Sequence, residues 1–251
     1  TNFVTSGIIG MVVNFFDTLG IGSFAPTTAL LRTFKQIDDR VLPGTLNVAC
    51  TIPVIVEAFA FIRAVEVEPI TLTSMLVAAS VGSYFGAGFM SKLPKATVQR
   101  VMAVALGLAG LVMLFQMLGI FPGGGEAIGL TGVALVIGVV GNLILGALMT
   151  AGVGLYAPCM ALVYLLGMSP AVAFPIMMGS CAYLMPICSV KFIKEGAYNR
   201  KASMAITIFG VVGVLIAVFL VTSLPLTVLK WLVVCVIAYT SISMFKASKT
   251  A

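Results

Sequence analysis

The residues whose spacing suggests chemistry form a segment that occurs twice in the chain. Residues 18–31 read TLGIGSFAPTTALL, and adding 132 to each number gives residues 150–163, TAGVGLYAPCMALV, without a gap. Each copy carries Gly-x-Gly followed four residues later by a proline, and each lies within apolar sequence. Glycine interrupts helices and proline is favoured in their first turn. We therefore expect each copy to end one helix and to begin another, near Pro26 or Pro158, inside a membrane.

A helix that begins inside a membrane points unpaired backbone N–H groups and a positive dipole end into the protein, and both attract anions. Two such N-termini, one from each copy, predict an anion-binding cradle near the middle of the membrane. The expected binding residues are Thr18, Gly20, Gly22, Ser23, Thr27 and Thr28 in the first copy, and Thr150, Gly152, Gly154, Tyr156 and Cys159 in the second. The alternative is a kinked helix whose glycines serve only close packing. The identical spacing in both copies favours the binding site.

Two acidic residues lie in apolar sequence near the first copy. Asp17 directly precedes it, where the second copy has Met149, and Glu57 lies late in the next apolar run. An acidic residue at membrane depth costs about 2.5–3.5 kcal/mol, so both are candidates for coupling. Because a fixed negative charge repels an anion, we expect Asp17 to be protonated or paired with a cation when substrate binds, which would couple transport to protons. Alternatively, Asp17 faces a wet vestibule, and Glu57 pairs with Arg63 or faces water.

Composition decides the class of protein. Hydrophobic residues make up 61% of the 251 residues and charged residues only 9%, whereas soluble domains carry about 25% charged residues. The chain is therefore predicted to be a multi-pass protein of the cell (plasma or inner) membrane. It has no histidine, which excludes Ser-His-Asp, Cys-His and His-ligated metal chemistry. We expect no enzyme activity, metal, cofactor or nucleic-acid partner; the expected partners are the bilayer, a small anion and a coupling proton or cation.

The apolar runs divide the chain into two similar halves. They span residues 4–31, 41–62, 69–91, 96–120, 128–166, 171–193, 202–222 and 226–245. We predict an all-α fold of two repeats, 1–121 and 128–251, joined by a Gly-rich linker at 122–127. Each repeat has one broken segment followed by three spans that each need about 20 residues.

Loop charge predicts the direction of the broken segments. If each one dips into the membrane and returns, the basic loops of the first half, loop 191–201 and the C-terminus all lie on the cytoplasmic side. Each repeat then crosses an odd number of times, so the two repeats have inverted topology, as in many secondary transporters. For residues 128–166, one full span plus a half-helix is the alternative.

Other features of the spans have ordinary structural explanations. Gly82 and Gly86 are expected to form a helix-packing face. Four polar residues in the spans that follow the breaks either face a cavity or form hydrogen bonds between helices: Asn47, Thr51, Ser180 and Tyr183. The five cysteines form no CxxC pair, and most of them are expected to be small buried residues.

The two breaks give the chain a family resemblance. A Gly-rich break followed by a proline-led half-helix, near the N-terminus and again past the middle, resembles the TauE/SafE family, also called the 4-toluene sulfonate uptake permease family. The residues that carry the resemblance are Gly20, Gly22 and Pro26, with Gly152, Gly154 and Pro158. It implies transport of sulfur-containing anions such as sulfite, thiosulfate or organosulfonates.

The sequence therefore predicts a secondary transporter of small sulfur-containing anions. An anion channel and a cation-coupled transporter of another small organic anion remain as alternatives. A cation site built from half-helix C-termini and Asp17 is a third. An intramembrane enzyme is disfavoured because histidine is absent and no paired carboxylates are expected.

Overall fold

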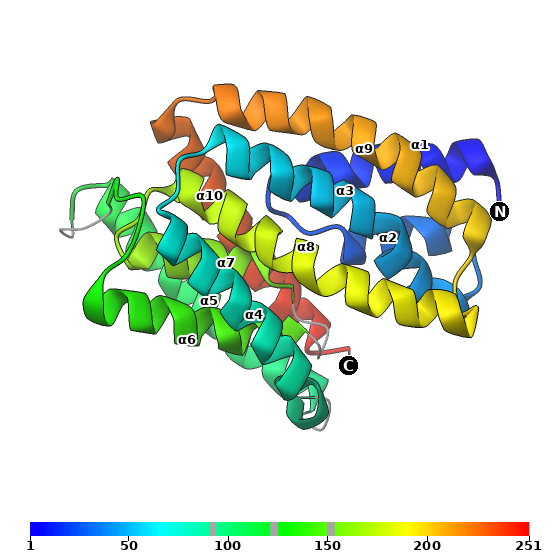
Figure 1. The fold of residues 1–251 in the computed structure, drawn as a ribbon, viewed down its shortest axis with the longest axis horizontal. Coiled ribbons are helices and arrows are strands. Elements are labelled where there is room, and N and C mark those ends of the chain that lie inside the picture. Colours follow the sequence, from blue (N-terminus) through cyan, green and yellow to red (C-terminus); the bar gives the residue numbers. More distant parts are fainter. Residues whose placement is uncertain (91–93, 121–124, 150–153, 251) are drawn as a thin grey trace. The chain divides into compact units, whose positions relative to one another are not determined.

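The computed structural model describes residues 1–90, 94–120, 125–149 and 154–250, and the elements assigned in them are helical (Figure 1). In the first half, α1 (Phe3–Thr18) and α2 (Phe24–Thr33) meet at the break, and a short 3-10 turn, η1 (Asp39–Val41), follows. Three long helices complete this half: α3 (Leu42–Ala64), α4 (Pro69–Met90) and α5 (Lys95–Met117). The second half has the same order: α6 (Gly132–Met149), α7 (Tyr156–Leu165), α8 (Pro170–Glu195), α9 (Arg200–Ser223) and α10 (Leu226–Ala247).

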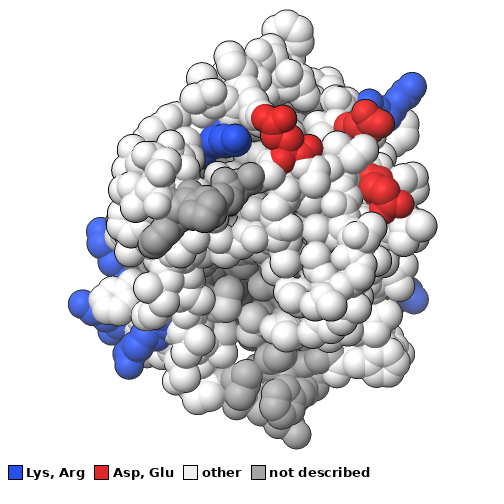
Figure 2. Space-filling view, turned by 90° about the vertical axis from the view of Figure 1, so that its left-hand side faces the viewer, with Lys and Arg blue, Asp and Glu red and all other residues white. Residues whose placement is uncertain are grey.

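The helices are long and apolar enough for a membrane. Within the described ranges, six of them can span one: α3, α5, α6, α8, α9 and α10. Figure 2 shows a face on which most side chains are uncharged. The prediction of an all-α polytopic membrane protein is confirmed. One difference is that α6, predicted as half of a broken segment, has 18 residues and is long enough to cross by itself.

The first broken segment enters and returns. The Thr1 hydroxyl donates to the Gln36 carbonyl oxygen at 2.6 Å, and the Asn2 N–H donates to Gln36 Oε1 at 2.7 Å. The residues before α1 and after α2 are therefore neighbours. Because both ends meet, α1 and α2 form a hairpin, as expected for a segment that dips into the membrane and returns.

The second broken segment closes in the same way. Ala127 and Met168 pair in an isolated bridge, and the Ser169 N–H donates to the Ala127 carbonyl oxygen at 2.9 Å. Met168 lies 132 residues after Gln36, so the equivalent position closes both hairpins. The long arm α6 thus belongs to a hairpin. Ala127, in the predicted linker, is part of this closure, whereas residues 122–124 of the linker lie outside the described residues.

The helices group into two compact units that do not coincide with the predicted repeats. Unit 1 contains residues 1–64 and 181–223, and unit 2 contains residues 65–180 and 224–251. In unit 1, α9 packs against α1 and α3; in unit 2, α4 packs against α6 and α5 against α10. Each unit therefore combines helices from both halves of the sequence. The inverted orientation of the two repeats stays a prediction.

The α1–α9 and α4–α6 packings use equivalent positions. A Cβ atom on Gly213 would collide with the carbonyl oxygen of Met11, and one on Gly82 would collide with that of Leu143. Gly82 and Gly213 are equivalent in the alignment of the halves, with an offset of 131, as are Met11 and Leu143, with an offset of 132. The expected packing role of Gly82 is confirmed, and the same close helix contact occurs once in each unit.

A second pair of equivalent contacts lies seven residues, or about two helical turns, earlier on α9 and on α4. In unit 1, a Cβ on Gly10 would lie 2.6 Å from the Cα of Ile206. At the equivalent positions of unit 2, Asn142 Nδ2 donates to the Met75 carbonyl oxygen at 2.7 Å. Backbone approaches of this kind need small residues or a side chain that bonds the neighbouring backbone. The α1–α9 contact of unit 1 and the α4–α6 contact of unit 2 therefore use equivalent positions, although the residues at those positions differ.

We expect Gly82→Ala and Gly213→Ala each to destabilise the protein. The added methyl group forces backbone apart in a packed contact, and such overpacking costs about 1–3 kcal/mol. Thermal unfolding in detergent, followed by circular dichroism, measures the effect. Gly110→Ala is the matched control, because its Cβ would lie an ordinary 3.4 Å from Ile237 Cγ2. An unchanged melting temperature in both variants would contradict the packing scheme.

Glu68 caps the start of α4. Its carboxylate accepts hydrogen bonds from the Thr71 hydroxyl and the Thr71 N–H, both at 2.7 Å, and from the Ile70 N–H at 3.1 Å. These bonds, the Thr71 hydroxyl first among them, hold the pKa of Glu68 below its ordinary value of 4.5. The ionised carboxylate therefore favours the folded state.

The pKa of Glu68 gives a pH prediction. Because the folded-state pKa is the lower one, this stabilisation is complete above pH 4.5 and is lost as the pH falls through the folded-state pKa. Melting temperatures recorded across that range should fall more steeply for the parent than for Glu68→Gln. Parallel curves for the two proteins would show that the cap is not formed.

Candidate functional site

The first break begins with a glycine that ends α1. Gly20 has a φ of 97°, the left-handed conformation that glycine adopts most readily. The Gly20 N–H donates to the Asp17 carbonyl oxygen at 2.8 Å, and the Ile21 N–H donates to that of Phe16 at 3.3 Å. This is a Schellman cap. It turns the chain out of α1 while satisfying two of its last carbonyl groups.

The new helix starts two residues before Pro26. Its first residue is Phe24, preceded by Ser23 as N-cap, and Pro26 is its third residue. The expected start near Pro26 is confirmed, and the proline is tolerated at this position because no intrahelical N–H bond is lost in the first turn. The first helical bond runs from the Thr27 N–H to the Ser23 carbonyl oxygen at 3.0 Å. In α7, Pro158 is likewise the third residue.

The start of α2 adjoins open space. Gly22 has a φ of 88°, and nothing lies within 4 Å of the position that its Cβ would take. The N–H groups of Phe24 and Ala25 have no carbonyl one turn earlier to bond to. The break therefore combines a positive helix end with room beside it.

The carboxyl group of Asp17 lies at this helix end. Asp17 is only 2% exposed, and the N–H and the hydroxyl of Ser23 both donate to its carboxyl group. The carboxylate thus caps α2 although it comes from the last turn of α1. A negative charge is unfavourable at a helix C-terminus and favourable at an N-terminus, so α2 is the stabilising partner.

Glu57 joins Asp17 from α3. It is fully buried, and its carboxyl group lies within hydrogen-bonding reach of the Asp17 carboxyl group. Thr18 Oγ1 lies 3.0 Å from Glu57 Oε1 and 2.8 Å from the Asn14 carbonyl oxygen. A hydroxyl carries one proton, so both contacts are hydrogen bonds together only when Glu57 is protonated and donates to Thr18.

Two sequence-based expectations about Glu57 are wrong. Paired carboxylates were not expected, yet Asp17 and Glu57 lie together. Glu57 does not face water, because it is buried. The Arg63 guanidinium lies over the Phe59 ring, 5.4 Å from its centroid, and a pairing of Glu57 with Arg63 stays a prediction. The reason is that α3 turns Glu57 toward α1 and not toward the end of its own helix.

Two further residues of this site were not predicted. Cys50 is fully buried, and its thiol lies within hydrogen-bonding reach of the Ser23 hydroxyl. It precedes Glu57 by two helical turns, so both lie on one face of α3; that spacing was the available signal. Asn14 lies one turn before Asp17, and its Oδ1, like Asp17 Oδ2, is a buried oxygen with no hydrogen-bond partner in the described structure.

Thr27 and Thr28, the other polar residues predicted in the first copy, are less available for binding a substrate. The buried Thr27 hydroxyl donates to the Ser23 carbonyl oxygen at 2.6 Å, so it serves its own helix. Thr28 is half-buried in α2. The first copy thus brings together Asp17, Thr18, Ser23 and Glu57.

The second break belongs to unit 2. Thr150 and Gly152 lie outside the described residues. Gly154 is exposed, and nothing lies within 4 Å of the position for its Cβ. Tyr156 and Cys159 are buried. Because the two breaks belong to different units, the cradle formed from both stays a prediction.

No basic residue occurs in the sequence around the first break. Three ranges contain no Lys, Arg or His: residues 3–31, which cover α1 and most of α2, residues 42–62 of α3 and residues 202–222 of α9. The acidic groups there therefore meet polar neutral groups and helix ends. Any balancing positive charge has to come from a proton, a bound cation or the dipole of α2.

The remaining polar residues of the spans have mixed roles. The Thr51 and Ser189 hydroxyls lie 2.7 Å apart and join α3 to α8 within unit 1. Ser180 accepts from Asn142 Nδ2 at 3.1 Å, and Tyr183 is 63% exposed. Hydrogen bonding between helices thus accounts for Thr51 and Ser180.

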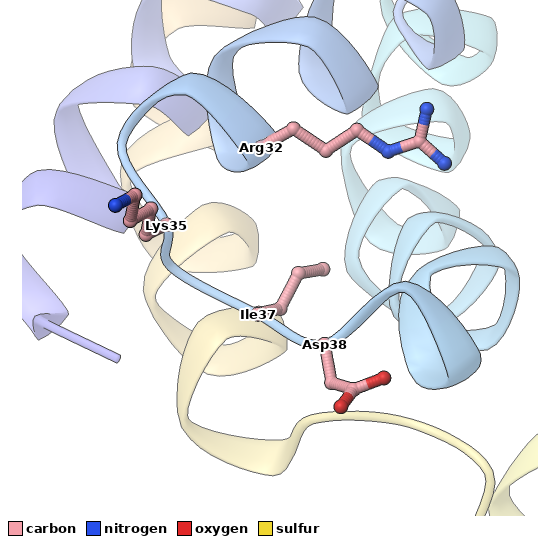
Figure 3. Close-up of a pocket in the computed structure, with 4 residues that line it drawn as sticks. All are labelled: Arg32, Lys35, Ile37 and Asp38. Carbon is pink, nitrogen blue, oxygen red and sulfur yellow. The ribbon is translucent and has the colours of Figure 1, made fainter.

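One surface hollow lies outside the break. It has a volume of about 470 Å³ and is lined by Arg32, Lys35, Ile37 and Asp38. Figure 3 shows that the charged side chains point in different directions, so they do not converge on one ligand. Across the described ranges, no group of three or more His, Cys, Asp or Glu residues could hold a metal ion.

We expect Thr18→Val to destabilise the protein. The variant keeps the shape but removes the buried hydroxyl that contacts Glu57, and loss of a buried partner costs about 1–3 kcal/mol. Thermal unfolding in detergent measures the change, and Thr18→Ser, which keeps the hydroxyl, is the control. Equal melting temperatures for Thr18→Val and the parent would show that Glu57 does not depend on this contact.

Comparisons with known proteins give no relative for this chain: no family model, curated protein or solved structure matches it.

Proposed function

We propose that the chain is a secondary transporter that carries small anions across the membrane, with sulfur-containing anions such as sulfite, thiosulfate or organosulfonates as the substrate class. The observation that carries the proposal is the first break. There a half-helix begins inside the protein, beside open space at Gly22. The sulfur class rests on the resemblance of the two Gly-x-Gly…Pro segments to the TauE/SafE family.

The start of α2 has the chemistry that an anion needs. Its first backbone N–H groups point away from the helix, and its dipole adds positive potential. An acidic side chain, Asp17, already uses this property, which supports an anion-binding role for the same position. Open space at Gly154 gives the second break similar room.

The path of the chain supports an orientation for the transporter. If both hairpins return and α3, α4, α5, α8, α9 and α10 each cross once, the connections and ends near residues 36, 93, 197 and 250 share one side. Of the 14 Lys and Arg residues, only Arg63 and Lys230 then lie on the opposite side. Basic residues concentrate in cytoplasmic loops, so we assign that common side to the cytoplasm.

A thermal-shift titration of the detergent-purified protein tests the proposal. Sulfite, thiosulfate and 4-toluenesulfonate are titrated against sulfate and benzoate. A ligand that binds only the folded state stabilises it by about 2.7 kcal/mol at 100 times its Kd. We expect one sulfur anion to raise the melting temperature and Gly154→Leu, which fills the open space of the second break, to abolish the rise.

Gly22→Leu is the corresponding variant of the first break and needs its own control. A leucine is strained at its φ of 88°, so Gly119→Leu is matched to it, since Gly119 has a φ of 74° and the same open surroundings. We expect Gly22→Leu, but not Gly119→Leu, to lose anion binding. If no anion binds the parent, or if the filled breaks bind as well as the parent, the proposed site is wrong.

A second candidate is a cation-coupled transporter. Asn14 Oδ1 and Asp17 Oδ2 are buried oxygens without hydrogen-bond donors, one turn apart on α1. Oxygens of this kind also suit a bound cation. The same titration, repeated in sodium and in potassium salts, separates the two forms, because only a cation-coupled site makes anion binding depend on the salt.

A further inference from the structure

The start of α2 is capped by a residue of α1. Ser23 is the N-cap residue of α2, and both its N–H and its hydroxyl donate to the Asp17 carboxyl group. A helix N-terminus is usually capped by the N-cap side chain itself, but the Ser23 side chain makes no such bond. The position that suits an anion at the start of α2 is therefore occupied by a carboxyl group from another helix.

The Asp17 carboxyl group has one oxygen without a hydrogen-bond partner in the described structure. Asp17 is 2% exposed, and this oxygen, Oδ2, is itself buried. A carboxylate that serves only as a permanent cap would be expected to satisfy both oxygens. An orphan oxygen at this place is the natural site for a proton.

The groups that face Asp17 make its negative charge and a second anion incompatible. From α3 these are Glu57 and Cys50, and both are acids. In α9, residues 202–223 contain no titratable group, and α2 contains none before Arg32 in its last turn. Because residues 3–31, 42–62 and 202–222 contain no Lys, Arg or His, an incoming anion and an ionised Asp17 would repel each other in an interior of low dielectric constant.

We propose that the Asp17 carboxylate is a tethered occupant of the anion site at the start of α2, which the transported anion displaces only when Asp17 takes up a proton. Protonation removes the negative charge, releases the Ser23 N–H and hydroxyl and leaves both as donors for the anion. Glu57, within reach of Asp17, is the neighbour that can pass this proton to it or share it. This inference rests on the proposed function and adds how protons control the site.

The proposal also assigns different tasks to the two breaks. The residue equivalent to Asp17 in the second half is Met149, whose thioether carries no charge. A tethered occupant is therefore present at the start of α2 and not at the start of α7. Proton control belongs to the first break, and the second binds or guides the anion without it.

Isothermal titration calorimetry with 4-toluenesulfonate tests the proposal. A sulfonate stays ionised between about pH 5 and pH 8, so any pH dependence belongs to the protein. We expect the Kd of the parent to rise about tenfold per pH unit at the alkaline end of this range, the limit for one proton taken up with each anion. Titrations in two buffers of different ionisation enthalpy should report that uptake directly on the unmodified protein.

Three variants locate the proton. Asp17→Asn should bind the sulfonate with the same affinity at every pH and without proton uptake. Asp38→Asn makes the same chemical change in an exposed loop of unit 1 and should keep the slope of the parent. If Asp17→Asn keeps the slope, or if only Glu57→Gln removes it, the tethered occupant is not Asp17 and the proposal is overturned.

The outcomes separate this proposal from the function on which it rests. Binding by the parent that does not change with pH, with no proton uptake, overturns the tethered occupant and leaves the anion transporter standing. If neither 4-toluenesulfonate nor thiosulfate binds at any pH, the proposed function itself fails and this inference fails with it. A variant that does not fold leaves the buffer comparison on the parent to decide.

Discussion

The structure depends on one constraint: a backbone that leaves the helical conformation inside a membrane must satisfy its polar groups within the protein. At the first break, Gly20 closes the end of α1, and the Asp17 carboxyl group caps the start of α2. The same constraint acts on α3, where Pro53 has no N–H to offer the Ala49 carbonyl oxygen. Thr207 of α9 donates to that oxygen instead, at 3.0 Å. The helices around the break are thus held by the bonds that the broken backbone requires.

The two halves share a scaffold but differ in chemistry. Both hairpins close at equivalent positions, Gln36 and Met168, and both contain a half-helix with proline as its third residue. The two buried acidic residues beside the first break have no acidic counterpart in the second half, because Asp17 corresponds to Met149 and Glu57 to Cys188. Identical scaffolds satisfy the same membrane constraint, whereas ionisable groups are costly there and persist where they serve a purpose. The difference between the acidic first break and the neutral second break is therefore better explained by different functions of the two breaks than by packing.

Sequence patterns predicted the features that depend on local backbone chemistry and not those that depend on helix rotation. The breaks, the returning hairpins and the packing role of Gly82 follow from glycine, proline and loop charge. The contact between Asp17 and Glu57 does not, because the polar residues Thr45, Thr51 and Glu57 point to different sides of α3 and its pattern does not reveal which face meets α1. Cys50 was missed for the same reason. The division into units that mix both halves was also hidden, since it depends on which helices pack together after insertion.

The most direct test of an anion transporter is uptake of ³⁵S-labelled thiosulfate into proteoliposomes that contain the purified protein. The account predicts uptake that saturates with concentration, exceeds that of empty liposomes and is inhibited by unlabelled 4-toluenesulfonate. Uptake that rises linearly without saturation would identify a channel instead. No uptake above empty liposomes for thiosulfate, sulfite or a sulfonate would contradict the account.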